Sequence, residues 1–146
     1  MDDVDRKLLS LLQADATQAY AALGKAVGLS GGAAHERVRK LRESGVIRRT
    51  TVEVDPAAVG SGVLAFVMVD SSAWMGDRGA RFAAIPELQE AHVIAGDASV
   101  LVKVRAGSTE QLQDVLRRLY EIEGVSGTRA TVALETFFER PVATQV

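Results

Sequence analysis

Basic side chains gather in one short stretch of the chain, between residues 25 and 50. This stretch holds seven Lys or Arg residues against two acidic ones, a local charge of +5, although the whole chain has a net charge of −2. Lys and Arg side chains can donate hydrogen bonds to phosphate oxygens and to the edges of bases. Because nucleic-acid affinity depends on the local field, this stretch favours contact with DNA despite the acidic total.

The spacing of residues within the stretch predicts a basic helix preceded by a shorter one. Ser30 stands where its side chain can cap a helix, and Gly45 stands where that helix can end. A short amphipathic segment, residues 20–27, lies in front and is joined through Gly28. Two short helices joined by a glycine-bearing turn, the second of them basic, are typical of a helix-turn-helix. The sequence therefore predicts double-stranded DNA as a partner.

The basic helix supplies most of the predicted DNA contacts. We expect its N-terminal residues to approach base edges and its basic side chains to reach phosphates or bases. Arg37 is the strongest single candidate. The predicted DNA-binding residues are Ser30, Gly31, Gly32, His35, Arg37, Arg39, Lys40, Arg48 and Arg49.

Some of these side chains have an alternative role. Arg39 or Arg42 could instead form an ion pair within the helix, with Glu43 or Glu36. Residues 48–49 fit a contact with the flanking DNA backbone and ordinary surface charge equally well.

Elements on both sides complete the first domain. A helix capped by Asp2 or Asp3 is predicted at the N-terminus from apolar residues spaced along one face. Residues 48–55 alternate polar and β-branched side chains and predict a strand, and Pro56 begins a hinge. We therefore predict a winged helix-turn-helix domain (1–48), a strand and hinge linker (49–62), and a second domain (63–146).

The second domain has the pattern of a ferredoxin-like α+β fold, with the order β-α-β-β-α-β. Two helices cover one face of such a sheet. The apolar residues of the other face predict burial against a second copy, most simply in a homodimer. The predicted strands are residues 63–70, 88–95, 100–105 and 125–138, and the predicted helices are residues 77–85 and the segment from Ser108 to Gly124.

A tight turn at residues 96–99 is the second candidate site. Successive N–H groups of a glycine turn can hold a carboxylate, and Asp97 or Ser99 can meet an ammonium or a polar group. The residues alone favour an ordinary hairpin turn, because Gly-Asp turns are common. Thr128 and Thr131 offer hydroxyl groups in the last strand, although threonine in a strand usually serves through its β-branch.

Enzymes and metal proteins are disfavoured. The chain has no cysteine, and its two histidines, His35 and His92, fall in different halves without metal-ligand spacing. The sequence offers no acid–base pair and no phosphate-binding glycine motif, so we expect no catalytic residue, metal or cofactor. The acidic start, the lack of cysteine and the lack of an apolar run of about 18 residues favour a cytoplasmic protein without a membrane span.

Taken together, these residues resemble the Lrp/AsnC family of transcription regulators, also called feast/famine regulators. The resemblance covers nearly the whole chain, and its first-half pattern is specific in combination. It is carried by residues 5–9, 12–16, 23, 27–30, 37–38, 40–41, 45–47, 54–55, 60, 96–97, 124–125 and 128–129.

The resemblance implies a winged helix-turn-helix followed by an effector domain of ferredoxin-like fold. It also implies homodimers that form through the effector domains and assemble to a tetramer or octamer. An amino acid or a related small metabolite would bind between subunits and change the assembly or the DNA affinity. The effector-binding residues implied in this way are Gly96, Asp97, Ala98, Ser99, Thr128 and Thr131.

The chain departs from the family pattern at several positions. Ser99 stands where the family commonly has a second acidic residue, and Gly32 stands where serine is frequent. Arg49 and Thr50 replace a common Gly-Tyr pair. The departure at Ser99 keeps an alternative open, an architectural protein that wraps or bridges DNA without a ligand.

Overall fold

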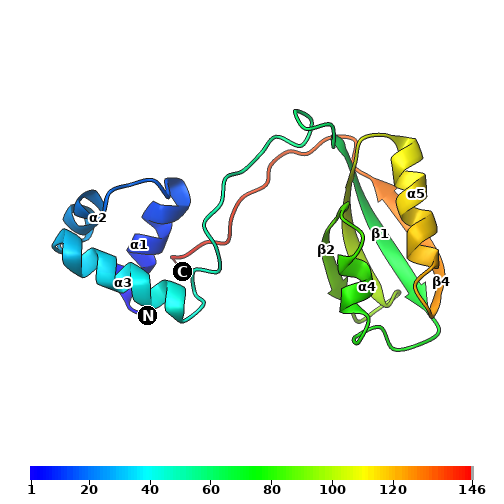
Figure 1. Cartoon of the computed structure of the whole chain (residues 1–146), viewed down its shortest axis with the longest axis horizontal. Helices are drawn as coiled ribbons and strands as arrows, with labels where there is room; N and C mark the ends of the chain where they lie inside the picture. The colour runs from blue at the N-terminus through cyan, green and yellow to red at the C-terminus, as the bar shows by residue number, and fades with distance from the viewer. Residues whose placement is uncertain (146) are drawn as a thin grey trace. The chain divides into compact units, whose positions relative to one another are not determined.

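The computed structural model describes residues 1–145, which fall into two compact units (Figure 1). The helical unit holds residues 1–52 together with the C-terminal segment from residue 138. The sheet unit holds Glu53–Phe137. The division after Val52 falls inside the segment predicted as strand and hinge, residues 49–62.

Three helices form the helical unit, α1 (Asp3–Ala14), α2 (Tyr20–Val27) and α3 (Gly31–Glu43). Asp2 caps α1 reciprocally: Asp5 N–H donates to the Asp2 carboxylate at 2.9 Å, and Asp2 N–H donates to the Asp5 carboxylate at 3.1 Å. A small apolar core joins the three helices. Its buried members are Leu8, Leu23 and Ala34, and Val4, Leu11, Leu12 and Val27 are partly buried around it. Helix α3 also buries Val38 and Leu41.

Two glycines allow the tight turn between α2 and α3. Gly28 ends α2 with a φ of 74°, in the left-handed region that favours glycine. Gly24 lies so close to the turn that a Cβ there would stand 2.6 Å from the Leu29 carbonyl oxygen. Ser30 then begins α3, and its Oγ accepts from Ala33 N–H at 3.1 Å, as its predicted capping role requires.

The prediction of a strand at residues 48–55 is wrong for the single chain. This segment lies in the described part of the chain and takes part in none of its strands. A strand needs a partner for its N–H and C=O groups, and this exposed segment pairs with no strand of its own chain. The described residues of one chain therefore form the helices of the predicted winged helix-turn-helix without a strand in its wing.

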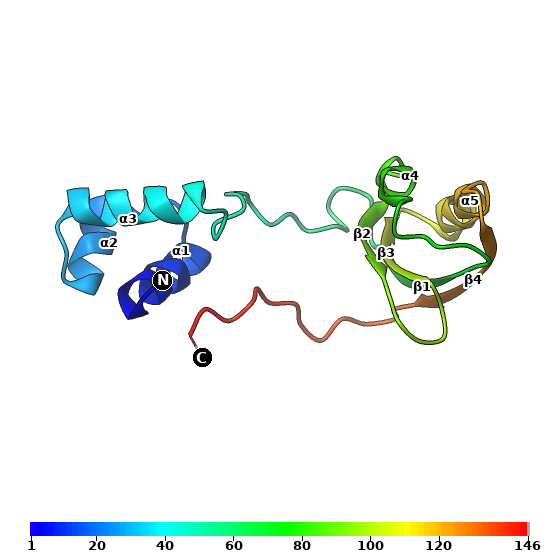
Figure 2. The ribbon, with the colours of Figure 1, turned by 90° about the horizontal axis from the view of Figure 1, so that it is seen from below.

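The sheet unit has the predicted order of elements. They are β1 (Val63–Ser71), α4 (Gly79–Ala83), β2 (Leu88–Val93), β3 (Val100–Ala106), α5 (Thr109–Tyr120) and β4 (Val125–Val132). The strands pair antiparallel in the order β2-β3-β1-β4, and both helices lie on one side of the sheet (Figure 2). This arrangement confirms the ferredoxin-like α+β fold.

The last strand is shorter than its predicted range, 125–138. It ends at Val132, because its partner β1 begins at Val63 and offers only one more ladder contact, from Ala133 N–H to Leu64 O at 2.9 Å. The end of the chain instead belongs to the helical unit.

The C-terminal segment is held on α1 by two side chains of that helix. Gln13 Nε2 donates to the carbonyl oxygen of Val142 at 3.0 Å, and Arg6 Nη1 donates to that of Thr144 at 3.3 Å. The acceptors are backbone oxygens, which any residue could offer, so no sequence pattern announces this contact.

One face of the sheet is covered by helices α4 and α5, and the other face is not (Figure 2). Alternate strand residues point to opposite sides, and one set packs under α4 and α5. The buried members of this set are all apolar, namely Ala65, Val67, Val69, Val100, Val102, Val104 and Ala106. On the other face Phe66 is 41% exposed, between its register partners Lys103 and Thr131. The structure thus leaves a large aromatic side chain uncovered at the centre of that face.

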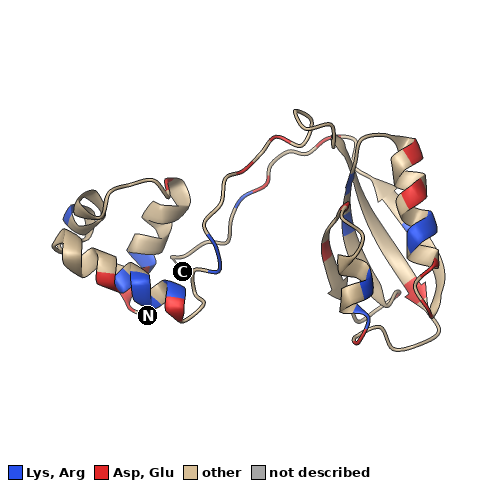
Figure 3. Ribbon diagram, in the orientation of Figure 1, with Lys and Arg blue, Asp and Glu red and all other residues tan. Residues whose placement is uncertain are grey.

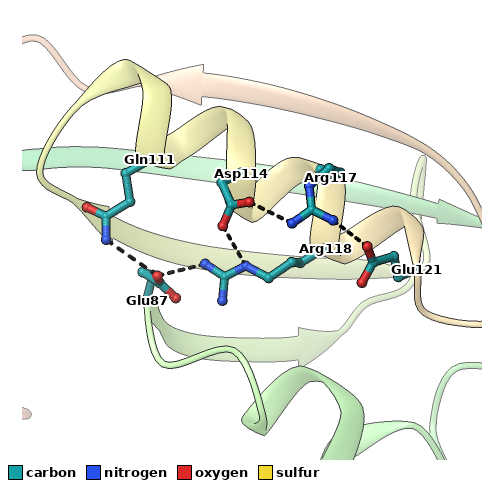
Figure 4. A network of polar contacts seen from close by, with 6 residues as sticks. All are labelled: Glu87, Gln111, Asp114, Arg117, Arg118 and Glu121. Carbon is teal, nitrogen blue, oxygen red and sulfur yellow. Dashed lines mark hydrogen bonds and ion pairs between the residues drawn. The ribbon is translucent and has the colours of Figure 1, made fainter.

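A polar network fixes α5 to the loop before β2 (Figure 4). Arg118 Nη2 donates to Glu87 Oε1 at 2.7 Å, and Arg118 Nε lies 2.9 Å from Asp114 Oδ2. The Arg118 guanidinium lowers the pKa of Glu87. The full network is Glu87, Gln111, Asp114, Arg117, Arg118 and Glu121. Each carboxylate in it is paired with an arginine, so the network serves as structural support for the helix layer.

Candidate functional site

The outward stripe of α3 lies opposite the residues that the helix buries, and it is the side open to a partner. With about 3.6 residues per turn, this stripe consists of Gly32, Glu36, Arg39 and Glu43. All four residues are exposed. Figure 3 shows acidic and basic residues following one another along the helix.

Arg39 lies between the two carboxylates of this stripe. Its Nε donates to Glu36 Oε2 at 2.9 Å and its Nη2 to Glu36 Oε1 at 2.6 Å, while its Nη1 donates to Glu43. These bonds raise the pKa of Arg39, and the same contact lowers the pKa of Glu36. The structure thus realises the ion pairs that the sequence offered as the alternative role of Arg39.

Arg37 lies on the flank of α3 that faces α1. Its Nη1 donates to Asp2 Oδ2 at 2.7 Å and to Asp5 Oδ1 at 3.0 Å, and 34% of its side chain is exposed. The Arg37 guanidinium lowers the pKa of Asp2 to about 2. Arg37 therefore ties α3 to the cap of α1. A DNA contact by Arg37 stays a prediction, and DNA would have to compete with two carboxylates.

The remaining cations of the helix are more open. Lys40 has its Nζ 3.9 Å from Glu36 Oε1, with 69% of its side chain exposed. Arg42 Nη1 donates to Thr50 Oγ1 at 2.6 Å rather than to an acid of the helix. Residues 48–49 are exposed beyond the end of α3.

The N-terminal turn of α3 is built from small residues. A Cβ on Gly31 would lie 3.2 Å from the Ala21 backbone, so Gly31 packs against α2, whereas a Cβ on Gly32 would meet nothing within 4 Å. His35 is exposed, and its ring centroid lies 4.5 Å from that of Tyr20. Ser30, Gly31 and Gly32, whose contacts with DNA stay a prediction, thus offer backbone groups more than side chains.

The predicted effector turn joins β2 to β3. Ile94 N–H donates to Ser99 O, and Ser99 N–H donates to Val69 O, both at 3.0 Å, so the turn is pinned to β1. Gly96 has a φ of 132°, which side chains rarely allow. Gly96 and Asp97 are exposed, and residues 98–99 are half-buried.

Arg129 of β4 contacts this turn, and the sequence did not predict that contact. Its Nη2 donates to the Asp97 carbonyl oxygen at 2.9 Å and to Asp70 Oδ1 at 3.0 Å. Asp70 raises the pKa of Arg129. In the sheet β1 lies between β4 and β3, and Arg129 reaches the turn past Asp70 at the end of β1, so only the folded structure shows this contact. The one signal in the sequence is that Arg129 lies inside the family pattern.

Thr128 and Thr131 are not brought together. They stand three positions apart on β4 and pair with Val69 and Phe66, so they point to opposite faces of the sheet. Thr128 is half-buried on the helix-covered face, and Thr131 is exposed on the same face as Arg129.

Two further classes of feature are absent from residues 1–145. Nowhere in this part of the chain do three or more His, Asp or Glu residues gather as a metal would need. None of its helices is long and apolar enough to cross a membrane.

Comparisons with known proteins agree with both units. Residues 1–42 match the AsnC-type helix-turn-helix domain, and residues 63–143 match the Lrp/AsnC ligand binding domain. The HTH-type transcriptional regulator FL11 of Pyrococcus horikoshii is 36% identical over 140 residues, which cover 95% of this chain and 93% of the relative.

Solved structures agree as well. Escherichia coli AsnC superposes with a TM-score of 0.89 at 28% identity and covers 98% of both chains. A feast or famine regulatory protein of Mycobacterium tuberculosis, solved with L-methionine, superposes with a TM-score of 0.87 at 34% identity over 94% of this chain and 95% of that one. The relatives are transcription regulators and not enzymes. This chain therefore belongs to the Lrp/AsnC family of transcription regulators.

Proposed function

We propose that this protein is a sequence-specific DNA-binding regulator whose assembly or DNA affinity responds to an amino acid or a related small metabolite. The effector binds at the turn of Gly96, Asp97, Ala98 and Ser99, between subunits. DNA is contacted by α3 and the segment after it, through the residues predicted from the sequence. Because DNA is its partner, the cytoplasm is the proposed place of action.

The charges at the β2–β3 turn carry this proposal. An amino acid is a zwitterion, and this site combines an exposed acidic residue, Asp97, with the guanidinium of Arg129. Arg129 donates to the Asp97 carbonyl oxygen at 2.9 Å, and 54% of its side chain is exposed. Backbone N–H groups of a glycine turn add a place for a carboxylate. The related protein of M. tuberculosis bound to L-methionine supports an amino acid as the chemical class. Because Ser99 stands in place of a second acid, Asp97 is the one carboxylate within the turn that can pair with the ammonium group of the effector.

The uncovered face of the sheet supports a homodimer. Phe66 at its centre is 41% exposed, and the neighbouring pair Met68 and Leu101 on the same face is only partly buried. Apolar side chains grouped in this way are expected to be covered by another surface. Pairing about a two-fold axis would place two α3 helices in successive major grooves, about 34 Å apart, on a pseudo-palindromic site. Further assembly to a tetramer or octamer belongs to the same proposal.

The mechanism is thermodynamic linkage. An effector that binds one assembly more tightly than another shifts the population toward it, and the DNA affinity follows that shift. The architectural alternative, DNA wrapping or bridging without a ligand, predicts an assembly and an affinity that no metabolite changes.

The test is light scattering after size-exclusion chromatography, with and without a panel of amino acids, on protein shown to bind its own promoter DNA. A change of mass or of DNA affinity with one amino acid supports the proposal. No change with any of them favours the architectural alternative.

The Gly96→Val variant locates the effector site. Valine is strained at the φ of 132° that Gly96 adopts, so the turn must change shape. We expect DNA binding without effector to stay and the effector response to be lost. A normal response in this variant would place the effector elsewhere.

A further inference from the structure

Glu36 is the first side chain of the outward stripe of α3 that can make a hydrogen bond. The stripe begins at Gly32, where a Cβ would meet nothing within 4 Å, and Glu36 follows one turn later. The residues before it on the first turn of the helix are glycine or alanine. A helix that starts with such small residues can bring its backbone close to base edges, and the first longer side chain then reaches them.

A carboxylate in this place needs a specific partner. DNA is a polyanion, so an acid on the side of the helix that faces it weakens binding to phosphates. Glu36 is exposed, and its contact with Arg39 lowers its pKa further from neutral, so it carries a full negative charge. The ion pair with Arg39 offsets part of the cost of this charge, and a hydrogen bond accepted from a base offsets more of it.

Cytosine is the base that suits a carboxylate best. In the major groove cytosine presents an amino donor, N4, without a neighbouring acceptor, whereas guanine presents acceptors and adenine presents its amino group beside N7. Each carboxylate oxygen has two acceptor sites, and Arg39 uses one on each oxygen of Glu36. Acceptor sites therefore remain for a base, and the contact with Arg39 holds the carboxylate in a defined direction.

We propose that Glu36 determines sequence specificity by accepting a hydrogen bond from the N4 amino group of a cytosine in each half-site of the DNA. This inference rests on the proposed function, since it assumes that α3 enters the major groove of a specific site. It adds to that function the identity of one base and the residue that reads it.

The test is selection of binding sites from random DNA duplexes by the full chain, for the wild type, Glu36→Gln and Glu43→Gln. Glutamine is nearly isosteric with glutamate and pairs with adenine through N6 and N7. We expect Glu36→Gln to lose the preference for one C·G pair per half-site, about tenfold in affinity, and to gain one for A·T there.

Glu43→Gln is the matched control. Glu43 is also exposed and contacts the same Arg39, and its change to glutamine removes the same negative charge. Glu43 lies two turns further along the helix. Both variants are expected to bind random DNA more tightly, because each loses one negative charge. Only Glu36→Gln is expected to change the preferred sequence.

The outcomes separate this inference from the function on which it rests. A wild type that binds all duplexes equally overturns sequence-specific binding itself. A wild type with a defined site whose base preferences survive in Glu36→Gln, or change equally in Glu43→Gln, overturns only the role of Glu36. Glu36→Asp, which keeps the charge but shortens the reach, is expected to weaken the same preference, and an unchanged preference in it speaks against direct contact.

Discussion

The helical unit and the sheet unit are stabilised by different means. The sheet unit buries a continuous apolar layer between its strands and two helices, with Val67, Val115 and Leu119 fully buried. The helical unit has a small core and adds surface contacts, such as the cap at Asp2 and the ion pair of Arg37. The sheet unit also has an ion-pair network at its surface, but because the core of the helical unit is smaller, we expect single polar and glycine positions to matter more in the helical unit.

Loss of one core side chain should give the largest difference in stability between the two units. Leu23→Ala empties part of the small core and is expected to destabilise the helical unit by about 3 kcal/mol. Because that unit has few other buried residues, α1 to α3 should unfold well below the melting temperature of the sheet unit, and DNA binding should be lost. Amide hydrogen exchange in the full chain measures the stability of each unit separately.

Leu119→Ala is the matched change in the larger core, since Leu119 is also fully buried. It should weaken the sheet unit and leave the protection of amides in α1 to α3 unchanged. If both variants melted both units together, the two cores would be one cooperative system and the comparison would fail.

Local patterns predicted most elements, and long-range contacts explain what they missed. The Ser30 cap and the buried stripe of α3 follow from residues within a few positions of each other, so sequence reasoning found them. The partner of Arg37 stands more than thirty positions away, at Asp2 and Asp5, and the contact of Arg129 with the effector turn depends on strand order. Neither contact has a local signal.

The strand predicted at residues 48–55 failed for a related reason. Alternating polar and β-branched residues show that a segment can be extended, but a strand exists only where a second segment offers hydrogen bonds. No segment within the described single chain does so here.

Two glycine substitutions in the helical unit are expected to change its stability less than Leu23→Ala does. Gly24→Ala would place a methyl group 2.6 Å from the Leu29 backbone oxygen, so α2 and the turn must separate, at a cost of about 1–3 kcal/mol. Gly32→Ala meets nothing within 4 Å and should stabilise α3 by about 0.5–1 kcal/mol. Thermal melting of both variants checks the opposite signs. Equal effects would show that the turn is not closely packed.

The smallest expected effect is the response of the helical unit to acid. The pKa of Asp2 is lowered from 3.8 to about 2, first by its hydrogen bond with Arg37 and then by the one from Asp5 N–H. A carboxylate with a lowered pKa stabilises the folded state above its ordinary pKa and loses that contribution as the pH falls through the folded value. The contribution of Asp2 is therefore complete near neutral pH, decreases as the pH falls below about 5, and is lost only below the folded pKa of about 2.

Asp2→Asn isolates this contribution from that of the other acids, because asparagine also caps helices but carries no charge for Arg37. The melting temperature of α1 to α3, followed by amide NMR signals, should be lower in the variant at neutral pH. The difference should shrink below about pH 5 and vanish only below about pH 2, while signals of the sheet unit stay equal in both proteins. A difference that stayed constant over this range would mean that the charge of Asp2 adds nothing to stability through Arg37, which would then be held by Asp5 alone.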